Sequence, residues 1–345
     1  METVKNTIAE NLGGSLSHSL APEDSQFALS SVPDLTGKVA VVTGGSEGIG
    51  YGCTHTLLSH NISKLFIISQ SLDIVSHALD AIRTELGPAA ASRVEWLPCD
   101  LSDWDAVAEV AARIAAQTAT LDILICNAAR GVMTAQRAAT SGIDLHMAIN
   151  HFGHAVLTSH LLPVLKATAA RGRAVRVVHL GSNAHEAAPQ DTGFASVEEL
   201  NRDCGPNAQY GRSKLAALLY ARYLARHLRA EHPNVLVNAA HPGFVDTKQS
   251  SELIHEAYPL GGYGMSVAMA PFKKDAMQGA VSAMFAATAT QRSGEYVCPP
   301  AIVEPGSEMS RDAELGEALM RLTREVVKER TRRSSVEQGC PFRDY

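Results

Sequence analysis

Tyr210 and Lys214 lie four residues apart at the start of a stretch, residues 210–232, whose composition predicts a helix. This spacing puts both side chains on one face of the helix, so they can share one site. A free tyrosine has a pKa of about 10, and a nearby ammonium lowers it by favouring the phenolate. No other tyrosine in the sequence has a lysine four residues on. The pair therefore predicts a site for general acid–base chemistry.

A glycine-rich turn follows the first apolar run and precedes a helical stretch, which is the context in which such a turn binds a dinucleotide. Gly44 permits the sharp turn, Gly48 lets a pyrophosphate approach the backbone, and Gly50 lets the helix pack on the strand. The first amides of that helix would face the phosphates. The residues of the turn expected to contact the cofactor are Gly44, Ser46, Glu47, Gly48, Ile49 and Gly50.

Three further polar residues follow apolar runs that read as strands. Asp100 could accept a hydrogen bond from an adenine amino group, and Asn127 would stand near the cofactor cleft. Ser182 closes the fifth run, and its hydroxyl could hold a substrate oxygen. Ligands of open α/β sheets bind at the carboxyl ends of the strands, so these positions fit a single cleft.

The elements that must position these residues alternate between short β-rich runs and longer Ala/Leu-rich helical stretches from about residue 35 onward. This alternation predicts a parallel sheet, and strands that are almost wholly apolar predict helices on both of its faces. We expect an α/β fold: a single doubly wound Rossmann-type domain with a mostly seven-stranded parallel sheet. The expected strands are residues 38–43, 64–69, 93–97, 121–126, 174–180, 235–240 and 295–298.

The chain divides into three regions by composition and by the pattern of apolar residues. Residues 1–34 form an arm that is either flexible or docked, and residues 35–305 form the dinucleotide-binding catalytic domain. Residues about 247–274, rich in Gly, Tyr and Met, predict a substrate lid within that domain. Residues 306–345 predict an amphipathic helix, with Leu315, Leu319, Leu322 and Val326 on one side, followed by a tail.

Composition limits the other functions. The 345 residues are 46% apolar and 19% charged, with a net charge of −6, which is typical of a globular protein and offers no basic field for nucleic acid or an anionic membrane. The six cysteines are scattered and no metal-ligand spacing is present, so we expect no metal site. The N-terminal residues do not resemble a signal peptide and no apolar run approaches a membrane span, which predicts an intracellular, cytoplasmic location.

The order of these motifs, over about residues 35–300, resembles the classical short-chain dehydrogenases/reductases. The late Gly294-Glu295-Tyr296 and the segment Asn-His-Phe-Gly-His, which begins at Asn150, are similar to the retinol-dehydrogenase-like branch and its fungal members. The motifs that carry the resemblance are Gly44-x-x-x-Gly48-x-Gly50, Asn127-Ala128, Asn150, Ser182, Tyr210-x-x-x-Lys214 and His241-Pro242-Gly243.

The resemblance implies a catalytic tetrad of Asn150, Ser182, Tyr210 and Lys214. Tyr210 would exchange a proton with a carbonyl or alcohol oxygen while a nicotinamide exchanges hydride at the carbon, and Ser182 would polarise that oxygen. Lys214 would lower the pKa of Tyr210 and bind the nicotinamide ribose. Asn150 would hold a water that relays protons from Lys214 to solvent. The family also pairs subunits through helices around Asn150 and Tyr210, which implies a homodimer or homotetramer.

The cofactor expected from the sequence is NADP(H) rather than NAD(H). Ser69 and Gln70 stand where an NAD site normally has the acidic residue that repels a 2′-phosphate. Glu47 opposes the phosphate, but an exposed carboxylate is screened by salt. The further cofactor contacts that the resemblance implies are Ser69, Gln70, Asp100, Leu101, Asn127, Ala128, Tyr210, Lys214, Pro242, Gly243, Val245 and Thr247.

Two other functions remain open at this point. A sugar-nucleotide epimerase or dehydratase also uses Tyr-x-x-x-Lys, but Glu47 occupies the place of its middle glycine. A non-catalytic NAD(P)-binding sensor commonly lacks a tetrad member, and all four are present here. We therefore expect an oxidoreductase that acts on the carbonyl or secondary alcohol of an apolar small molecule.

Overall fold

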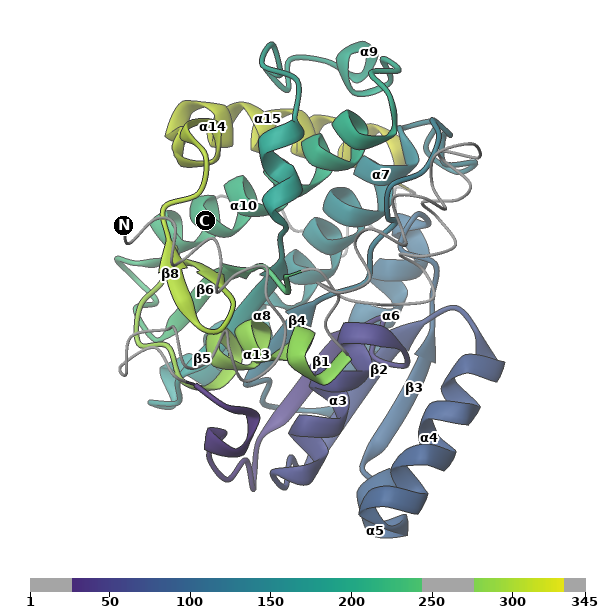
Figure 1. Cartoon of the computed structure of the whole chain (residues 1–345), viewed down its shortest axis with the longest axis vertical. Helices are drawn as coiled ribbons and strands as arrows, with labels where there is room; N and C mark the ends of the chain where they lie inside the picture. Colours follow the sequence, from purple (N-terminus) through teal and green to yellow (C-terminus); the bar gives the residue numbers. More distant parts are fainter. Residues whose placement is uncertain (1–26, 244–275, 332–345) are drawn as a thin grey trace, which may run out of the picture.

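The computed structural model describes residues 27–243 and 276–331 (Figure 1). The expected lid at about 247–274 lies outside the described residues, as do Val245, Thr247, most of the N-terminal arm and the last part of the C-terminal tail. Within the described ranges, no helix is both long and apolar enough to cross a membrane.

One sheet forms the centre of the fold, with strand order β3-β2-β1-β4-β5-β6-β7-β8. The first seven strands along the chain run parallel, which confirms the doubly wound α/β prediction. An eighth strand, β8, pairs antiparallel with β7 at the edge and was not expected, because its three residues are too few to show a period. The strands are β1 (Val39–Thr43), β2 (Lys64–Ser69), β3 (Val94–Pro98), β4 (Ile123–Cys126), β5 (Val175–Leu180), β6 (Val235–Ala240), β7 (Tyr296–Cys298) and β8 (Ile302–Glu304).

Helices cover both faces of this sheet and enclose two apolar cores. The core on one face includes residues of α6, α8, α10 and α15, and the core on the other includes residues of α3 and α13. The longer helices are α3 (Gly48–Ser59), α4 (Leu72–Leu86), α6 (Trp104–Gln117), α8 (His154–Ala170), α10 (Pro206–Leu228), α13 (Ala276–Thr288) and α15 (Ala313–Arg330). Shorter turns are η2 (Leu29–Ser31), α5 (Pro88–Ala91), α7 (Leu145–Met147), η3 (Ala148–Gly153), η4 (Asn183–Ala187), α9 (Val197–Leu200) and α14 (Glu308–Arg311).

The two cores explain why the strands are apolar at every position. Successive strand residues point to opposite faces, so Val41 enters one core while Ala40 and Val42 enter the other. In β2, Phe66 belongs to the first core and Leu65 to the second. A sheet covered on one face only would have left alternate positions polar.

The C-terminal helix α15 packs along α10 and buries most of the apolar side that its sequence predicted. Leu319, Leu322 and Val326 are buried in the core that α10 also lines. Most residues of α10 are themselves buried. The helix that carries Tyr210 is therefore covered on its outer side by the chain's own C-terminal helix.

Three buried histidines lie close together between η3, α8 and β5. The rings of His154 and His179 are 6.4 Å apart, and the ring of Tyr220 lies 5.6 Å from His151 and 5.0 Å from His179. Burial lowers the pKa of His151 to about 3 and of His154 to about 4, and it holds the pKa of His179 well below its ordinary value. All three imidazoles are neutral in the folded protein near pH 7.

These histidines predict that the protein loses stability in mild acid. In the unfolded chain each histidine takes up a proton near pH 6.5, whereas the folded pKa values are lower. The unfolded state therefore binds more protons than the folded state below pH 6.5. The stability that comes from the neutral histidines is fully present above pH 6.5, and the free energy of unfolding falls as the pH drops toward 5. Each histidine contributes a slope of roughly 1.4 kcal/mol per pH unit in this window.

Urea unfolding at pH 7.5, 6.5 and 5.5 measures this slope. His151→Gln should reduce it by the share of one histidine, whereas His77→Gln, at an exposed position, should leave it unchanged. An unfolding free energy that stays constant between pH 7.5 and 5.5 would contradict the assignment of neutral buried rings.

Candidate active site

The glycine-rich turn brings the first helix directly against the end of the first strand. Gly44 and Gly48 adopt φ values of 61° and 52°, in the left-handed region that favours glycine. At Gly50 a Cβ atom would stand 2.0 Å from the carbonyl oxygen of Gly44, so a side chain there would collide with backbone. The N-terminus of α3 thus meets the turn closely, and its free amides form a place for an anion.

Two side chains brace this turn from behind. Asn127 Nδ2 donates to the carbonyl oxygens of Thr43 at 2.9 Å and Gly44 at 3.2 Å. The hydroxyl oxygen of Thr43 accepts hydrogen bonds from the backbone amides of Asn127 at 2.9 Å and Ala128 at 3.0 Å. The structure therefore uses the Asn127 side chain to hold the glycine-rich turn in shape, at the edge where β1 and β4 end.

The residues expected to meet the adenosine half of a cofactor lie at the carboxyl ends of β2 and β3. Ser69 is half-buried, and its hydroxyl oxygen accepts a hydrogen bond from Trp96 Nε1 at 3.2 Å. Gln70 is exposed, as is Asp100, whose Oδ1 accepts from the Ser102 amide at 2.8 Å. Leu101 is buried.

This arrangement fits a dinucleotide. Strand order reverses between β1 and β4, where ligands of such sheets bind, and the close packing at Gly50 holds the N-terminus of α3 against this edge of the sheet. Glu47, the first residue before α3, is exposed and makes no capping hydrogen bond with its side chain. On the other side, Pro242 and Gly243 follow β6, and Gly243 has a φ of 80°.

Lys214 lies on α10 one turn after Tyr210, as the spacing predicted. Its Nζ atom is 5.5 Å from the centre of the Tyr210 ring and donates to the carbonyl oxygen of Leu180 at 2.8 Å. The side chain is buried, and burial lowers the pKa of Lys214 to about 8. The ammonium is thus held beside the tyrosine by the last residue of β5.

The pKa of Tyr210 differs from the expectation. Burial raises the pKa of Tyr210 to about 12, and a hydrogen bond with Ser182 opposes this rise only in part. The four-residue spacing indicates the charge of Lys214 nearby but not the desolvation of the phenolate, which is the larger effect here. Without ligands, the phenol is protonated near neutral pH and can act as a proton donor.

Ser182 is held by the short 3-10 turn that it begins. Its hydroxyl oxygen accepts from the Ala184 amide at 3.1 Å, and the hydroxyl also hydrogen-bonds Tyr210. Ser182 follows β5, and Tyr210 lies in the first turns of α10, so two different elements converge on this contact. A substrate oxygen could reach both hydroxyl groups at this point.

Asn150 lies in a π-helical turn, η3, and its side chain organises the neighbouring loop. Its Oδ1 accepts from the Arg130 amide at 2.7 Å, and its Nδ2 donates to the Arg130 carbonyl oxygen at 3.0 Å and to Ser213 Oγ at 2.9 Å. Single π-turns within helices are frequent at functional sites. The side chain of Asn150 thus ties the loop after β4 to α10.

His154 links this π-turn to the glycine-rich turn. Thr43 Oγ1 already accepts two backbone N–H groups, so at 2.9 Å its hydroxyl donates to His154 Nε2. His154 Nδ1 therefore carries the proton and donates to the main-chain oxygen of Asn150 at 3.2 Å. A neutral imidazole, kept so by burial, bridges the strand end that precedes the cofactor turn and the backbone of Asn150.

The sequence did not single out several residues that hold this site together. The sequence assigned no role of this kind to His154, Thr43, Ser213 or Arg130. Their roles arise from contacts between elements that lie far apart along the chain, which no local pattern encodes.

Comparison with known proteins gives three relevant matches. A family model described as short chain dehydrogenase matches residues 38–192. The chain is 49% identical over 349 residues to bli-4 of Neurospora crassa, named as a mitochondrial oxidoreductase, with 100% of this chain and 84% of that protein covered. It is 32% identical over 275 residues to the polyprenol dehydrogenase of Danio rerio, covering 78% of this chain and 79% of the relative.

Among solved structures, L-sorbose reductase from Gluconobacter frateurii, complexed with NADPH and L-sorbose, has a TM-score of 0.57 and 21% sequence identity. The match covers 76% of this chain and 95% of the reductase. At this identity the likeness shows a shared fold.

Gly50→Ala should weaken the binding of a nicotinamide dinucleotide at least tenfold. The new methyl group would lie 2.0 Å from the Gly44 oxygen and 2.5 Å from Asn127 Nδ2, so the turn must open. Fluorescence titration with the reduced cofactor measures affinity, and thermal unfolding reports the fold. Gly316→Ala on α15 is the control, since its nearest neighbour would be 3.8 Å away and alanine favours a helix. Unchanged affinity in Gly50→Ala would contradict the close-turn argument.

Proposed function

This chain belongs to the short-chain dehydrogenase/reductase family and is an NAD(P)-dependent oxidoreductase, and we propose that it transfers hydride between NADP(H) and a carbonyl or secondary alcohol of an apolar small molecule. The observation that carries the proposal is the hydrogen bond between the Ser182 and Tyr210 hydroxyl groups, with the buried Lys214 beside them. Tyr210 is the general acid and base of the reaction.

In the reducing direction Tyr210 gives its proton to the substrate carbonyl oxygen as negative charge develops there. Ser182 donates its hydroxyl hydrogen bond to the same oxygen and polarises the carbonyl. A nicotinamide bound beside these residues would supply the hydride for the carbonyl carbon, or accept it in the reverse direction. The ammonium of Lys214 stabilises the phenolate left on Tyr210, and the Asn150 side chain keeps the neighbouring loop in place.

The name of one relative supports the proposed substrate class. The polyprenol dehydrogenase of Danio rerio is named for a long apolar alcohol, and the resemblance of this sequence to the retinol-dehydrogenase-like branch favours the same class. The epimerase alternative has no support among the compared relatives, which are named as oxidoreductases and dehydrogenases. A non-catalytic sensor would bind cofactor without consuming it. Turnover of a panel of carbonyl compounds therefore distinguishes the oxidoreductase from the sensor.

NADP(H) is favoured by the neutral end of β2. Ser69 accepts a hydrogen bond from Trp96, which leaves its own hydroxyl hydrogen to donate to a phosphate, and Gln70 is an exposed amide beside it. Glu47 is exposed, so salt screens its repulsion of a phosphate. The structurally similar L-sorbose reductase is complexed with NADPH.

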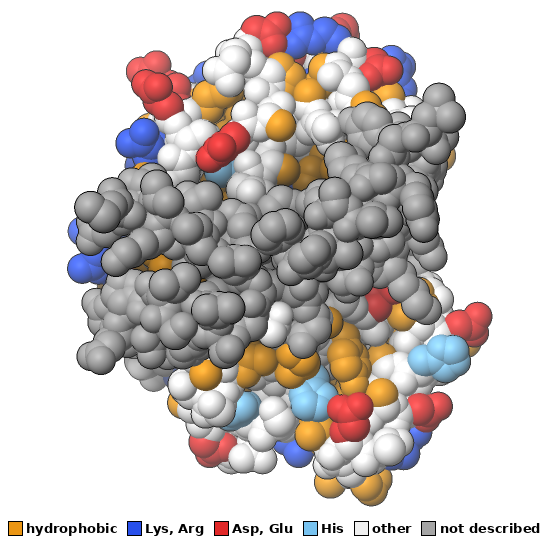
Figure 2. All heavy atoms as spheres, in the orientation of Figure 1, with side chains coloured by type: hydrophobic (Ala, Val, Ile, Leu, Met, Phe, Trp, Pro, Cys, Tyr) orange, Lys and Arg blue, Asp and Glu red, His pale blue; other side chains and the backbone are white. Residues whose placement is uncertain are grey.

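The remaining expectations about partners and location stay predictions. On the face shown in Figure 2, acidic and basic side chains of the described residues are mixed along the rim, an arrangement that does not favour nucleic acid. The predicted cytoplasmic location differs from the location in the name of bli-4, which is described as mitochondrial. For the expected homo-oligomer, α15 already covers α10, so subunits would have to pair through other surfaces.

Tyr210→Phe should lower kcat by roughly 10²- to 10⁴-fold while leaving cofactor affinity unchanged, because only the acidic hydroxyl is removed. Tyr220→Phe on the same helix is the matched control and should retain kcat within about twofold, since Tyr220 lies in the core. Steady-state kinetics on a panel of apolar aldehydes and ketones measures both. Retention of more than about a tenth of wild-type kcat in Tyr210→Phe would rule out the proposed role.

The cofactor proposal predicts a higher kcat/KM with NADPH than with NADH. Glu47→Lys should raise the NADPH:NADH ratio by roughly fivefold, because a charge near the 2′-phosphate changes sign in a screened, exposed setting. Glu325→Lys makes the same charge change on the exposed face of α15 and should leave the ratio unaltered. A preference of the wild-type enzyme for NADH would overturn this choice of cofactor.

A further inference from the structure

His185 lies one short turn after Ser182 and is almost completely buried, with 2% of its surface exposed. Its Nε2 atom faces the backbone N–H of Ser307 at 3.0 Å. A backbone N–H can only donate, so Nε2 is an acceptor and the ring proton lies on Nδ1. Nδ1 then donates to the main-chain oxygen of Ser182 at 2.6 Å. The contacts fix a single neutral tautomer.

This imidazole closes the turn that carries Ser182. The main-chain oxygen of Ser182 accepts the His185 backbone N–H at 3.1 Å as well as the ring N–H. Inside the same turn the Ser182 hydroxyl oxygen accepts from the Ala184 amide. The direction of the Ser182 hydroxyl thus depends on a turn that the His185 ring holds shut.

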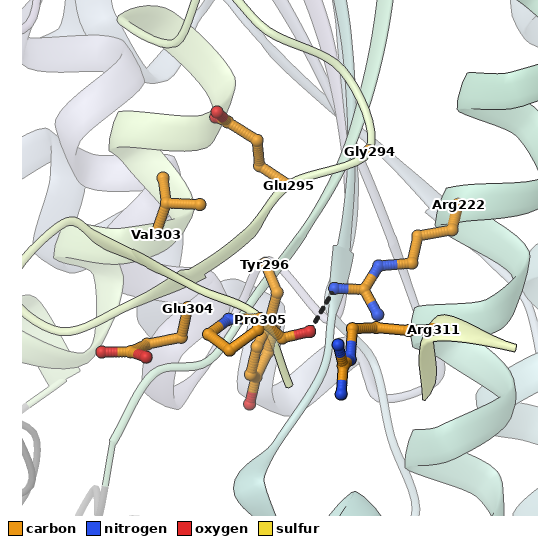
Figure 3. Close-up of a pocket in the computed structure, with 8 residues that line it drawn as sticks. All are labelled: Arg222, Gly294, Glu295, Tyr296, Val303, Glu304, Pro305 and Arg311. Atoms are coloured by element: carbon orange, nitrogen blue, oxygen red, sulfur yellow. Dashed lines mark hydrogen bonds between the residues drawn. The ribbon is translucent and has the colours of Figure 1, made fainter. Parts of the chain in front are cut away.

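The partner of His185 belongs to the C-terminal strap, which we define as residues 305–311. Arg222 of α10 anchors the strap: its Nη2 donates to the Pro305 oxygen at 2.7 Å, and its Nη1 donates to the main-chain oxygen of Ser310 at 2.7 Å. Figure 3 shows the Arg222 guanidinium reaching Pro305 at a cavity of about 380 Å³ beside Tyr296 and Arg311. The helix that carries Tyr210 thereby also holds the strap that carries Ser307.

Backbone conformation and packing bring the strap to the ring. Gly306 has a φ of 68°, and a Cβ atom there would lie 2.7 Å from Ser310 Oγ, so the position favours glycine. The ring of His185 also meets that of Tyr296 edge-on, with centroids 5.4 Å apart. Burial lowers the pKa of His185, in agreement with a neutral ring.

We propose that His185 is a positioning residue for the proposed reaction: its neutral ring ties the C-terminal strap to the Ser182 main chain and so directs the Ser182 hydroxyl toward Tyr210. The inference rests on the proposed function, in which Ser182 polarises the substrate carbonyl. A loss of this link should reduce kcat more than cofactor affinity, because the cofactor turn lies at the ends of other strands.

The tautomer can be measured without any substrate. In protein labelled with ¹⁵N-histidine, His185 should show a protonated Nδ1 and an unprotonated Nε2 near pH 7, and its signals are assigned by their absence in His185→Asn. A ring protonated at Nε2, or one that exchanges between tautomers, would overturn the proposal. This result does not depend on whether the substrate class is right.

Three substitutions of His185 separate its hydrogen bond to Ser182 from its packing. Asparagine places an amide nitrogen near the position of Nδ1, glutamine places one near Nε2, and phenylalanine keeps the ring contact with Tyr296. We expect His185→Asn to retain kcat within about threefold and His185→Gln and His185→Phe to lose roughly tenfold or more, with cofactor affinity unchanged in all three. Equal kcat in the three variants would contradict a positioning role.

Ser307 provides a matched pair at the other end of the link. Its φ of −65° suits proline, which has no N–H, so Ser307→Pro removes the donor to His185 Nε2. Ser307→Ala keeps that N–H and loses only the side chain that caps α14. Ser307→Pro should lower kcat and allow the His185 proton to exchange between Nδ1 and Nε2. Ser307→Ala should change neither kcat nor the tautomer.

Thermal unfolding checks that both Ser307 variants fold, and the tautomer and His185 variants decide the proposal if the proline variant does not. Ser307→Pro that folds with wild-type kcat and the wild-type tautomer would overturn it. Wild-type protein that binds cofactor but reduces none of the carbonyl panel would contradict the proposed function, and the ¹⁵N signals would then still test the link itself.

Discussion

The close approach of α3 to the end of β1 is the constraint on which the rest of the site depends. Because Gly50 leaves no room between the helix and the Gly44 carbonyl, the helix amides reach the carboxyl edge of the sheet. The turn keeps this shape through Asn127 and Thr43, which join β1 to β4. His154 then extends the same set of hydrogen bonds to the main chain of Asn150. The glycine-rich turn and the π-helical turn that carries Asn150 are thus joined by one set of hydrogen bonds.

Two neutral histidines, His154 and His185, hold main-chain atoms near the candidate site in place. His154 and His185 each donate from Nδ1 to a main-chain oxygen of a predicted tetrad residue, and each accepts at Nε2 from a fixed donor. A buried imidazole can do this only while neutral, since a second ring proton would face another N–H or O–H. The same burial that keeps these rings neutral makes them a cost to folding in acid.

The sequence predicted the parallel sheet because fully apolar runs such as Val39–Thr43 need helices on both faces. This prediction uses only neighbouring residues and no knowledge of contacts between distant parts of the chain. It also predicted the pairing of Tyr210 with Lys214, which depends only on helical spacing. It did not predict β8, whose Ile302–Glu304 is too short for a period, nor the link from Ser307 to His185, which joins residues 122 positions apart. The pKa of Tyr210 escaped prediction for a related reason, since desolvation depends on what packs around the ring.

Burial shifts both groups of the acid–base pair toward their neutral forms, with the pKa of Tyr210 near 12 and that of Lys214 near 8. A phenolate on Tyr210 and the ammonium of Lys214 would stabilise each other, because opposite charges nearby favour both charged forms. In the proposed reaction, proton transfer from Tyr210 to a substrate oxygen would create a phenolate on a ring whose centre lies 5.5 Å from Lys214 Nζ. The attraction between the two side chains would therefore become strongest when the proton leaves Tyr210. The proposed reduction would begin from a protonated Tyr210, and the raised pKa of its phenol favours that state near neutral pH.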